Sequence, residues 1–349
     1  SIISEANYTV TSKSNVALYY GQGADQQDLL NFCQQSSVDI IPLAFIDRFP
    51  AQGNGWPGTN FGNQCWGGSY VYSGPGNDSA LNQLQSECPQ LVADIPICQS
   101  VYGKKIVLSL GGGDGGYQLT GATDGEAFAD FLWGAFGPQT QDWLDQSLPR
   151  PFDGPNNSSV EVDGFDFDIE IQSLDKQAGY IAMIQRLRSY FPRAHKEYII
   201  TGAPQCVVPD ANMGSMIAAT QFDIIWVQYY NTPQCSARNW ATANPNYLST
   251  GIEEPNGFSY NQWTNFLVGT ASANAELFIG LPGAPSSTNL STDNYLNITE
   301  MSGLVKAYYC QSNFGGVMIW EATAAEDNTG PNGTYYQAVK EVLLGYNAD

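Results

Sequence analysis

The chain has 349 residues, of which 43 % are hydrophobic and 13 % charged, and its formal net charge at pH 7 is −21. Such an acidic surface repels polyphosphates and anionic lipids, which argues against nucleic acid and membranes as partners but is compatible with a neutral polymer. The length suits one large domain or two modest ones, and no segment approaches the roughly 18 unbroken apolar residues of a membrane span. The start at Ser1, without a recognisable signal peptide, fits a processed mature chain.

Short apolar runs alternate along the chain with longer amphipathic stretches, and most runs are continuous, as in parallel strands buried on both faces. The predicted strands are 16–20, 40–46, 106–110, 164–170, 198–203, 224–230, 277–281 and 316–320. Helices are predicted at 26–34, 125–136, 176–190 and 334–345. Eight such βα units predict an α/β fold, a single-domain (β/α)8 TIM barrel with long βα loops, over residues 15–345 after an N-terminal arm at 1–14.

Two stretches between the predicted elements are rich in aromatic side chains. The loop at about 47–81 holds Trp56, Trp66, Tyr70 and Tyr72 among many glycines, and the stretch from Trp240 to Trp263 is similar. Such side chains can stack on sugar rings, but a packed Ω-loop is an equally good interpretation.

The strongest chemical signal is the octapeptide Asp-Gly-Phe-Asp-Phe-Asp-Ile-Glu at 163–170. Alternate side chains of a strand share one face, so Asp166, Asp168 and Glu170 should point into one space. Their mutual repulsion should leave at least one protonated at neutral pH, as a general acid requires. They end the fourth predicted strand, where TIM barrels place their chemistry. A metal or ion-pair cluster is the weaker interpretation, because Lys, Arg and His are scarce.

The seven cysteines form no C-x-x-C pair and the chain has a single histidine, which argues against zinc. Disulfides with one thiol left over are expected, and Cys310, just before an apolar strand, is predicted to be that thiol, buried and inert. His195 is predicted to be a solvated loop residue, which weakens Ser/His and Cys/His hydrolase interpretations.

Sequons indicate a eukaryotic secreted protein, extracellular or associated with the cell wall, whose candidate glycosylation sites lie on surface loops. These sites are Asn7, Asn77, Asn156, Asn157, Asn289, Asn297 and Asn332.

Over nearly its whole length, the chain resembles glycoside hydrolase family 18, and in particular its class III chitinases of plants and fungi. Residues 163–170 fill every position of the family's D-x-x-D-x-D-x-E motif. The other similar segments are Ser109–Gly112, Tyr19–Gln22 (with Tyr20 where the plant enzymes usually carry Trp), Ala203–Cys206, Trp226–Asn231 and Gly316–Trp320.

The resemblance implies a retaining, endo-acting fungal chitinase that uses substrate-assisted catalysis. Glu170 would protonate the glycosidic oxygen, while the substrate's own acetamido oxygen attacks and forms an oxazolinium ion. Asp168 would stabilise that ion, Asp166 would share a proton with Asp168, and Tyr230 would hold the acetamido oxygen. Trp320 would form the floor beneath the reacting sugar.

The resemblance further implies substrate contacts from Tyr19, Gln22, Phe45, Gly112, Gln205, Gln228, Asn231 and Trp320. It implies the disulfides Cys33–Cys98, Cys65–Cys88 and Cys206–Cys235, with Cys310 free. No cofactor and no metal are expected. The partners would be chitin and chito-oligosaccharides, and the protein would be a monomer. Asp163 is equally well explained as a structural turn residue, and Ser109 is expected mainly to permit close packing beneath the site.

Three alternatives remain beside the chitinase. A non-catalytic lectin or enzyme inhibitor of the same fold would normally have lost the acidic glutamate or blocked the cleft. An endo-β-N-acetylglucosaminidase acting on N-glycans would use the same carboxylates. A structural cell-wall protein is the third possibility.

Overall fold

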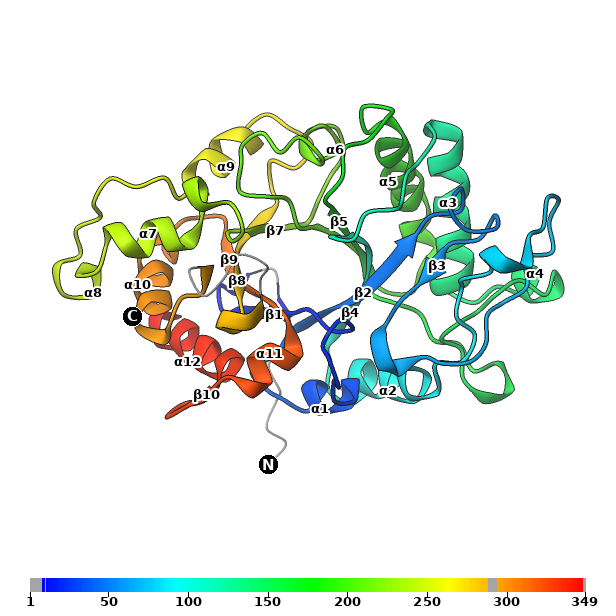
Figure 1. The fold of residues 1–349 in the computed structure, drawn as a ribbon, viewed down its shortest axis with the longest axis horizontal. Coiled ribbons are helices and arrows are strands. Elements are labelled where there is room, and N and C mark those ends of the chain that lie inside the picture. The colour runs from blue at the N-terminus through cyan, green and yellow to red at the C-terminus, as the bar shows by residue number, and fades with distance from the viewer. Residues whose placement is uncertain (1–7, 10, 288–293, 348–349) are drawn as a thin grey trace.

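The computed structural model describes residues 8, 9, 11–287 and 294–347 (Figure 1). The sequons at Asn7 and Asn289 lie outside these residues. The other five sequon asparagines are exposed. Among the helices of the described ranges, none has the length and apolar character to cross a membrane.

Eight parallel strands form a ring, which closes where the first strand pairs with the second as well as with the last (Figure 1). The TIM barrel predicted from the sequence is therefore confirmed. The barrel strands are β1 (Asn15–Leu18), β2 (Ile40–Arg48), β4 (Lys105–Gly112), β5 (Gly164–Ile169), β6 (Ile199–Gly202), β7 (Ile224–Gln228), β8 (Glu276–Pro282) and β9 (Phe314–Trp320).

Three short strands lie outside the ring and were not predicted. β3 (Gly58–Thr59) pairs antiparallel with the end of β2 and extends the sheet beyond the barrel. β10 (Thr329–Gly330) and β11 (Gly333–Thr334) form a two-stranded hairpin before the last helix. These strands are only two residues long, too short for any periodicity to reveal them.

Helices surround the ring, as Figure 1 shows. They are α1 (Leu29–Cys33), α2 (Pro89–Ser100), α3 (Ala122–Phe136), α5 (Ala178–Tyr190), α6 (Gly214–Ala219), α9 (Tyr260–Leu267), α10 (Ile298–Tyr308) and α12 (Tyr335–Asn347). Shorter helices in the loops are α4 (Gln141–Asp145), α7 (Ala237–Ala243), α8 (Tyr247–Thr250) and α11 (Ala322–Asp327). All four predicted helices are present. The first begins later than predicted, because Asp28 has an extended backbone and Leu29 is the first helical residue.

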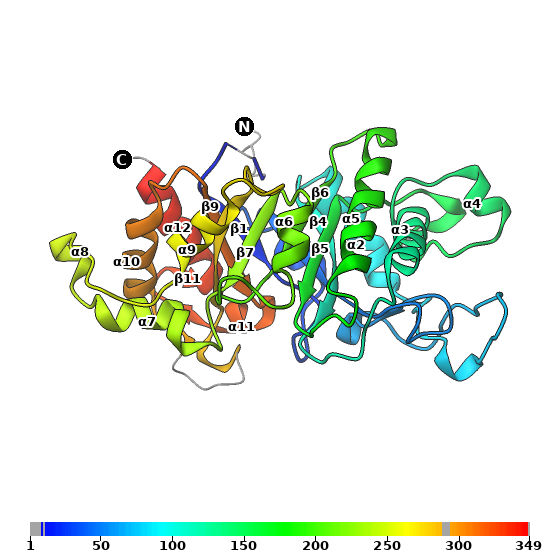
Figure 2. The same cartoon turned by 90° about the horizontal axis from the view of Figure 1, so that it is seen from above.

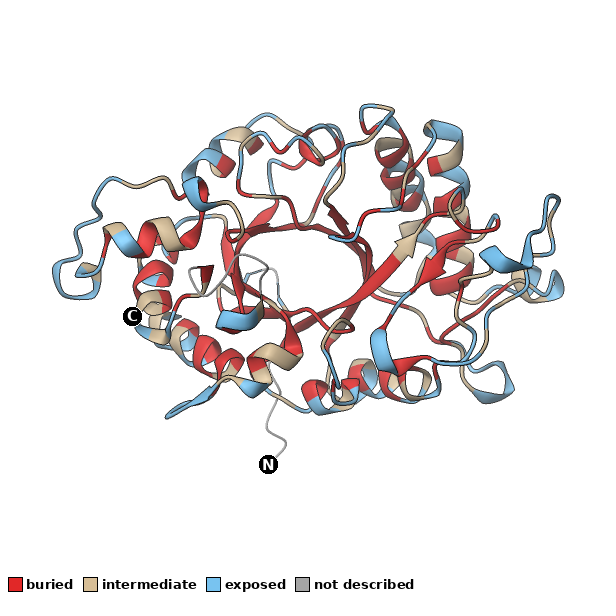
Figure 3. Ribbon diagram, viewed as in Figure 1, coloured by how far each residue is buried: buried red, intermediate tan, exposed pale blue. Residues whose placement is uncertain are grey.

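The alternation of β5 divides its side chains between two environments. Phe165, Phe167 and Ile169 join the large core between the strands and the helices. Asp166 and Asp168 occupy the intervening positions and face the inside of the ring. Burying a phenylalanine side chain stabilises a fold by roughly 2–3 kcal/mol, so the apolar face fixes the register that presents the carboxylates. Figure 3 shows the strand ring as an almost continuously buried layer.

Most aromatic side chains of the two stretches pack against other parts of the protein, either half-buried or buried. Trp56 packs on Tyr72, with ring centroids 5.3 Å apart, and on Phe131 at 6.0 Å. Trp240 and Trp263 belong to the core. Trp66 is the exception, because 57 % of its surface is exposed. The packed-loop interpretation therefore holds for the buried residues. In Figure 1 the region of β3 and α4 and the region of α7 and α8 lie at opposite ends of the elongated molecule.

The structure forms the three disulfides implied by the resemblance, Cys33–Cys98, Cys65–Cys88 and Cys206–Cys235. Each should stabilise the fold by about 2–4 kcal/mol, mainly by restricting the unfolded chain.

The prediction for the leftover thiol was wrong, because Cys310 is exposed rather than buried. It lies in the turn between the end of α10 and the start of β9, where the chain runs over the outer surface. His195 is an exposed loop residue, as predicted.

Candidate active site

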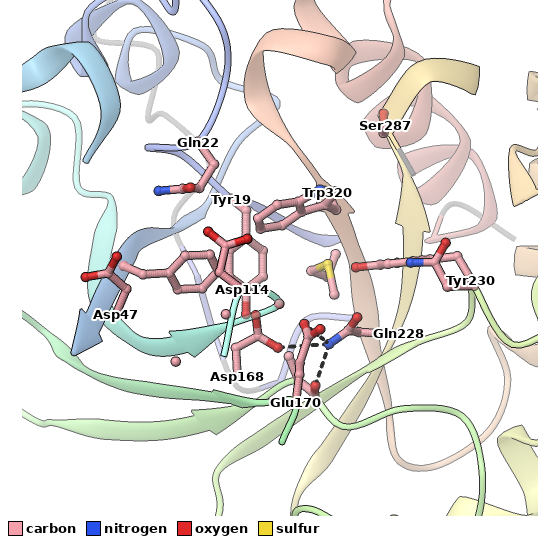
Figure 4. Close-up of a pocket in the computed structure, with 17 residues that line it drawn as sticks. Tyr19, Gln22, Asp47, Asp114, Asp168, Glu170, Gln228, Tyr230, Ser287 and Trp320 are labelled. Atoms are coloured by element: carbon pink, nitrogen blue, oxygen red, sulfur yellow. Dashed lines mark hydrogen bonds between the residues drawn. The ribbon is translucent and has the colours of Figure 1, made fainter. Parts of the chain in front are cut away.

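A cavity of about 270 Å³ opens at the carboxyl ends of the barrel strands (Figure 4). Its lining includes seven of the eight expected substrate contacts, together with Asp168, Glu170 and Tyr230 of the expected catalytic set. The lining residues are Tyr19, Gln22, Phe45, Asp47, Gly111, Gly112, Gly113, Asp114, Asp168, Glu170, Ala203, Gln228, Tyr230, Asn231, Ser287, Met318 and Trp320.

Asp166 lies beneath the cavity and is completely buried. The strand register places Ser109 and Thr201 on either side of it, on β4 and β6. Their hydroxyls donate to its carboxylate at 2.6 and 2.7 Å, and the Tyr19 hydroxyl donates at 2.5 Å. Burial raises the pKa of Asp166, and these hydrogen bonds oppose the rise. Ser109 is therefore more than the packing residue that we expected, because it is a direct hydrogen-bond partner of the buried acid.

Asp168 and Glu170 share one amide donor. Nε2 of Gln228 donates to Oδ1 of Asp168 at 2.9 Å, to Oε1 of Glu170 at 3.1 Å and to the carbonyl of Ala203 at 2.8 Å (Figure 4). Asp168 is 4 % exposed, whereas Glu170, just past the strand end, is partly exposed.

The pKa of Asp168 is raised well above its usual value. Burial is the largest cause, followed by the charge of Glu170, a hydrogen bond with Glu170, and the charge of Asp166. The donor Gln228 opposes the rise. The surroundings of Asp168 therefore favour the protonated form of its carboxyl group.

Aromatic side chains form the wall opposite the carboxylates. The rings of Phe45 and Trp320 stack with centroids 5.9 Å apart at an angle of 23°, and Tyr19 packs against Trp320 at 5.3 Å. The Tyr19 hydroxyl, which donates to Asp166, accepts a hydrogen bond from Trp226 at 2.9 Å. Tyr230 is nearly buried, and its pKa is raised by burial and then by the charges of Asp168 and Glu170. Its hydroxyl therefore stays protonated and available as a donor.

Two further expected contacts, Gln22 and Gly112, are fixed in place by the neighbouring backbone. Nε2 of Gln22 donates to the carbonyls of Asn60 at 2.9 Å and Ala44 at 3.1 Å. Gly112 has a φ of +104°, and a Cβ there would lie 3.0 Å from the Phe45 ring. A glycine is required at this point, because a larger residue would be strained and would push into the cavity wall.

Gln205 is the expected contact that the structure does not bring to the cavity. Its backbone N–H donates to Asp210 at 2.7 Å, and its side-chain oxygen accepts from Thr232 at 3.3 Å. The neighbouring disulfide of Cys206 with Cys235 ties this segment to the loop after β7. These contacts turn the Gln205 side chain toward the loop instead of the substrate space.

Asp163 has a structural role. Its carboxylate accepts from the backbone N–H of Ile106 at 2.8 Å and from Gln99 at 2.9 Å, and it forms an ion pair with Lys196 at 2.9 Å. The acid that opens the motif therefore joins β5 to its neighbours and takes no part in the cavity.

Tyr117 is a residue of the site that the sequence did not reveal. Its hydroxyl donates to the carbonyl of Gly112 at 2.8 Å and accepts from the backbone N–H of Glu170 at 3.0 Å. It thereby fixes the point where the chain leaves β5 and presents Glu170. Only its position shortly after the glycine-rich end of β4 could have signalled this role.

Among the residues that the structure describes, no three His, Cys, Asp or Glu side chains are arranged to hold a metal ion.

A barrel strand that aims spaced carboxyl groups into an aromatic-walled cavity is the construction of a TIM-barrel glycosidase. The chain belongs to Glycosyl hydrolases family 18, whose model matches residues 15–308.

Fungal proteins and plant structures are among the most similar relatives. The chain is 44 % identical over 349 residues to a probable endochitinase of Arthroderma benhamiae, and the match covers 96 % of this chain and 44 % of that protein. This chain thus spans less than half the length of that fungal relative. The crystal structure of the chitinase ICChI from Ipomoea carnea is 27 % identical with a TM-score of 0.68, covering 94 % of this chain and 99 % of that one. The xylanase and α-amylase inhibitor XAIP-II from Scadoxus multiflorus is 26 % identical with a TM-score of 0.65, covering 96 % and 98 %.

Proposed function

We propose that residues 15–345 form the catalytic barrel of a secreted, retaining endochitinase that hydrolyses β-1,4 bonds between N-acetylglucosamine units. The observation that carries the proposal is the meeting of Asp168, Glu170 and Tyr230 around one cavity with the aromatic pair Phe45 and Trp320. The family membership and the names of the fungal relatives support the same substrate.

The reaction begins when an N-acetylglucosamine unit stacks on Trp320 and its acetamido group turns toward Tyr230. Tyr230 donates a hydrogen bond to the acetamido oxygen and holds it beneath the anomeric carbon. The tethered oxygen attacks, which avoids the entropic cost of bringing in a separate nucleophile. Glu170 protonates the departing glycosidic oxygen as that bond breaks.

The intermediate is a positively charged oxazolinium ion. Asp168 leaves its proton with Glu170 and turns to the acetamido N–H, where its negative charge stabilises the ion. Because Gln228 donates to both carboxyls, it keeps Glu170 in place while Asp168 turns. Glu170, now a base, takes a proton from the water that opens the ring, and the product keeps the original anomeric configuration.

The test uses chitohexaose with the wild type, Glu170→Gln and Glu341→Gln, the last being an exposed glutamate on α12 and a matched control. Loss of the general acid should lower kcat by about 10²–10⁴-fold, whereas the control should match the wild type. NMR of the earliest products should show the β-anomer. Equal activity of Glu170→Gln and the wild type, or α-anomers at first, would refute the mechanism.

A non-catalytic binding or inhibitory role is the second candidate, favoured by the similarity to an inhibitor of xylanase and α-amylase. Under this candidate the wild type would bind chitohexaose without hydrolysing it, or would inhibit those two enzymes. Titration of xylanase and α-amylase with the protein, beside the hydrolysis assay, separates the two functions.

A further inference from the structure

Two acids in the cavity lining, Asp47 and Asp114, have no part in the mechanism above. Asp47 lies near the end of β2, two residues beyond Phe45, and Asp114 follows the glycines at the end of β4. In Figure 4, Asp47 and Gln22 lie on one side of the catalytic carboxyls and Tyr230 and Ser287 on the other. Asp47 thus lies to one side of the catalytic carboxyls, and Asp114 lies in the lining of the same cavity.

The negative charge of the cavity lining is not balanced by a cationic side chain among the described lining residues. Four of the lining residues carry carboxyl groups, Asp47, Asp114, Asp168 and Glu170, and none of the described lining residues is Lys, Arg or His. A neutral chitin chain offers hydroxyl and amide groups, which amide side chains such as Gln22 can satisfy. Asp47 and Asp114 could also accept hydrogen bonds from such a chain, but their two additional negative charges favour a positively charged one.

Arg48 is the cation beside Asp47, and its guanidinium is shared between that carboxylate and two backbone carbonyls. Its Nη1 donates to the backbone carbonyls of Asp47 at 2.7 Å and Gly115 at 3.2 Å and lies 3.8 Å from the Asp47 carboxylate. Burial raises the pKa of Asp47, the charge of Arg48 opposes the rise, and the charge of Asp114 adds to it. Asp47 and Asp114 line the same cavity, and the single guanidinium of Arg48 offsets only part of their charge.

We propose that Asp47 and Asp114 select a cationic glucosamine unit next to the reacting N-acetylglucosamine, so that the preferred polymer is partially deacetylated chitin. The inference rests on the proposed function. The reacting unit must keep its acetyl group, because the acetamido oxygen is the nucleophile. Its neighbour needs no acetyl group, and its ammonium can pair with the two acids. A chain that contains both kinds of unit supplies the acetamido nucleophile and the ammonium group that pairs with Asp47 and Asp114.

The test compares chitohexaose with chitosan in which about half of the units are acetylated. The variants are Asp47→Asn, Asp114→Asn, the double variant and the remote control Glu341→Gln. The readout is the ratio of kcat/KM on chitosan to kcat/KM on chitohexaose. Partly exposed ion pairs contribute modestly, so each single variant should lower the ratio about two- to fivefold, and the control should leave it unchanged. Added salt should lower the wild-type ratio toward that of the double variant.

Sequencing of the chitosan products by mass spectrometry gives an independent readout. The wild type should leave glucosamine enriched at a fixed position next to the cleavage point, and the double variant should leave it at the frequency set by the polymer. Asp114 is exposed, so Asp114→Asn keeps the test valid even if Asp47→Asn fails to fold. An unchanged ratio with glucosamine at its chance frequency overturns the inference alone, whereas wild type inactive on chitohexaose overturns the proposed function as well.

Discussion

The two ends of the barrel both bury carboxyl groups, but they provide for them differently. At the cavity end, Asp166 accepts hydrogen bonds from three hydroxyl groups, and Asp168 accepts one from the side-chain amide of Gln228. At the opposite end, Glu276 begins β8 and is 9 % exposed, yet neither carboxyl oxygen has a hydrogen-bond partner among the described residues. Burial raises the pKa of all three groups.

The comparison teaches that a raised pKa is not by itself a sign of function. Glu276 has a pKa of about 8 because burial disfavours its charge, and the charge of Lys13 only partly opposes this. Asp166 and Asp168 accept hydrogen bonds from side chains of other barrel segments, which fix where their oxygens point. A defined orientation, added to the shifted pKa, is what distinguishes the reacting end from the other.

Among the variants that compare the two ends, the largest expected effect is on activity, from Asp168→Asn. In the proposed mechanism the amide would lack the negative charge that stabilises the oxazolinium ion, so kcat on chitohexaose should fall about 10²–10³-fold. Glu276→Gln should retain wild-type kcat in the same assay, because that side chain lies at the other end of the barrel. A kcat of Asp168→Asn within threefold of the wild type would mean that the two ends do not differ as we argue.

The next largest effect is on stability, from Glu276→Gln. The folded-state pKa of about 8 exceeds the ordinary value, so the carboxyl is protonated in the fold. The contribution of Glu276 to the free energy of unfolding is fully present below about pH 4.5 and is lost as pH rises through 8. At pH 8.5 the glutamine variant should be more stable than the wild type by about 2 kcal/mol, after allowance for solvent near the group.

Denaturant unfolding at pH 4 and pH 8.5 measures this difference. Glu341→Gln, at an exposed site, serves as the control and should follow the wild type at both pH values. If the stability of Glu276→Gln depended on pH as that of the wild type does, the burial of a charge on Glu276 would not destabilise the fold.

The smallest effect should come from Ser109→Ala. The change removes the 2.6 Å hydrogen bond to Asp166 and leaves those from Tyr19 and Thr201. One such bond is worth about 1 kcal/mol, so kcat/KM should fall about three- to tenfold. The pKa of Asp166 should rise further, because a donor that lowered it is lost, and the acidic limb of the pH profile should move upward.

Ser100→Ala is the matched control for that prediction. Its hydroxyl donates to the carbonyl of Pro96 near the end of α2, far from the cleft. It should leave both kcat/KM and the pH profile as in the wild type. If kcat/KM of Ser109→Ala were lower at every pH but its acidic limb stayed at the same pH, Ser109 would have only a packing role.

The barrel and the carboxylate face of β5 could be predicted from the sequence, because parallel strands leave continuous apolar runs and a period of two fixes the faces. Side chains that approach from loops could not be predicted in this way. Tyr117 and Asp114 lie on the loop after β4, where no period applies. Gln205 sits in a matching motif, but hydrogen bonds to Asp210 and Thr232 turn it away. Cys310 was misjudged because the strand after it is buried, whereas the turn that holds it is not.

The pairing of β1 with β9 also places the two ends of the barrel domain on one side of the molecule. β1 begins at the end of the barrel opposite the cleft, and α12 runs back against the strands and ends on that same side (Figure 2). A support or a fused module attached through either terminus would therefore hold the molecule from behind. Its open mouth would still point outward, and a long polysaccharide could pass across it without meeting the tether.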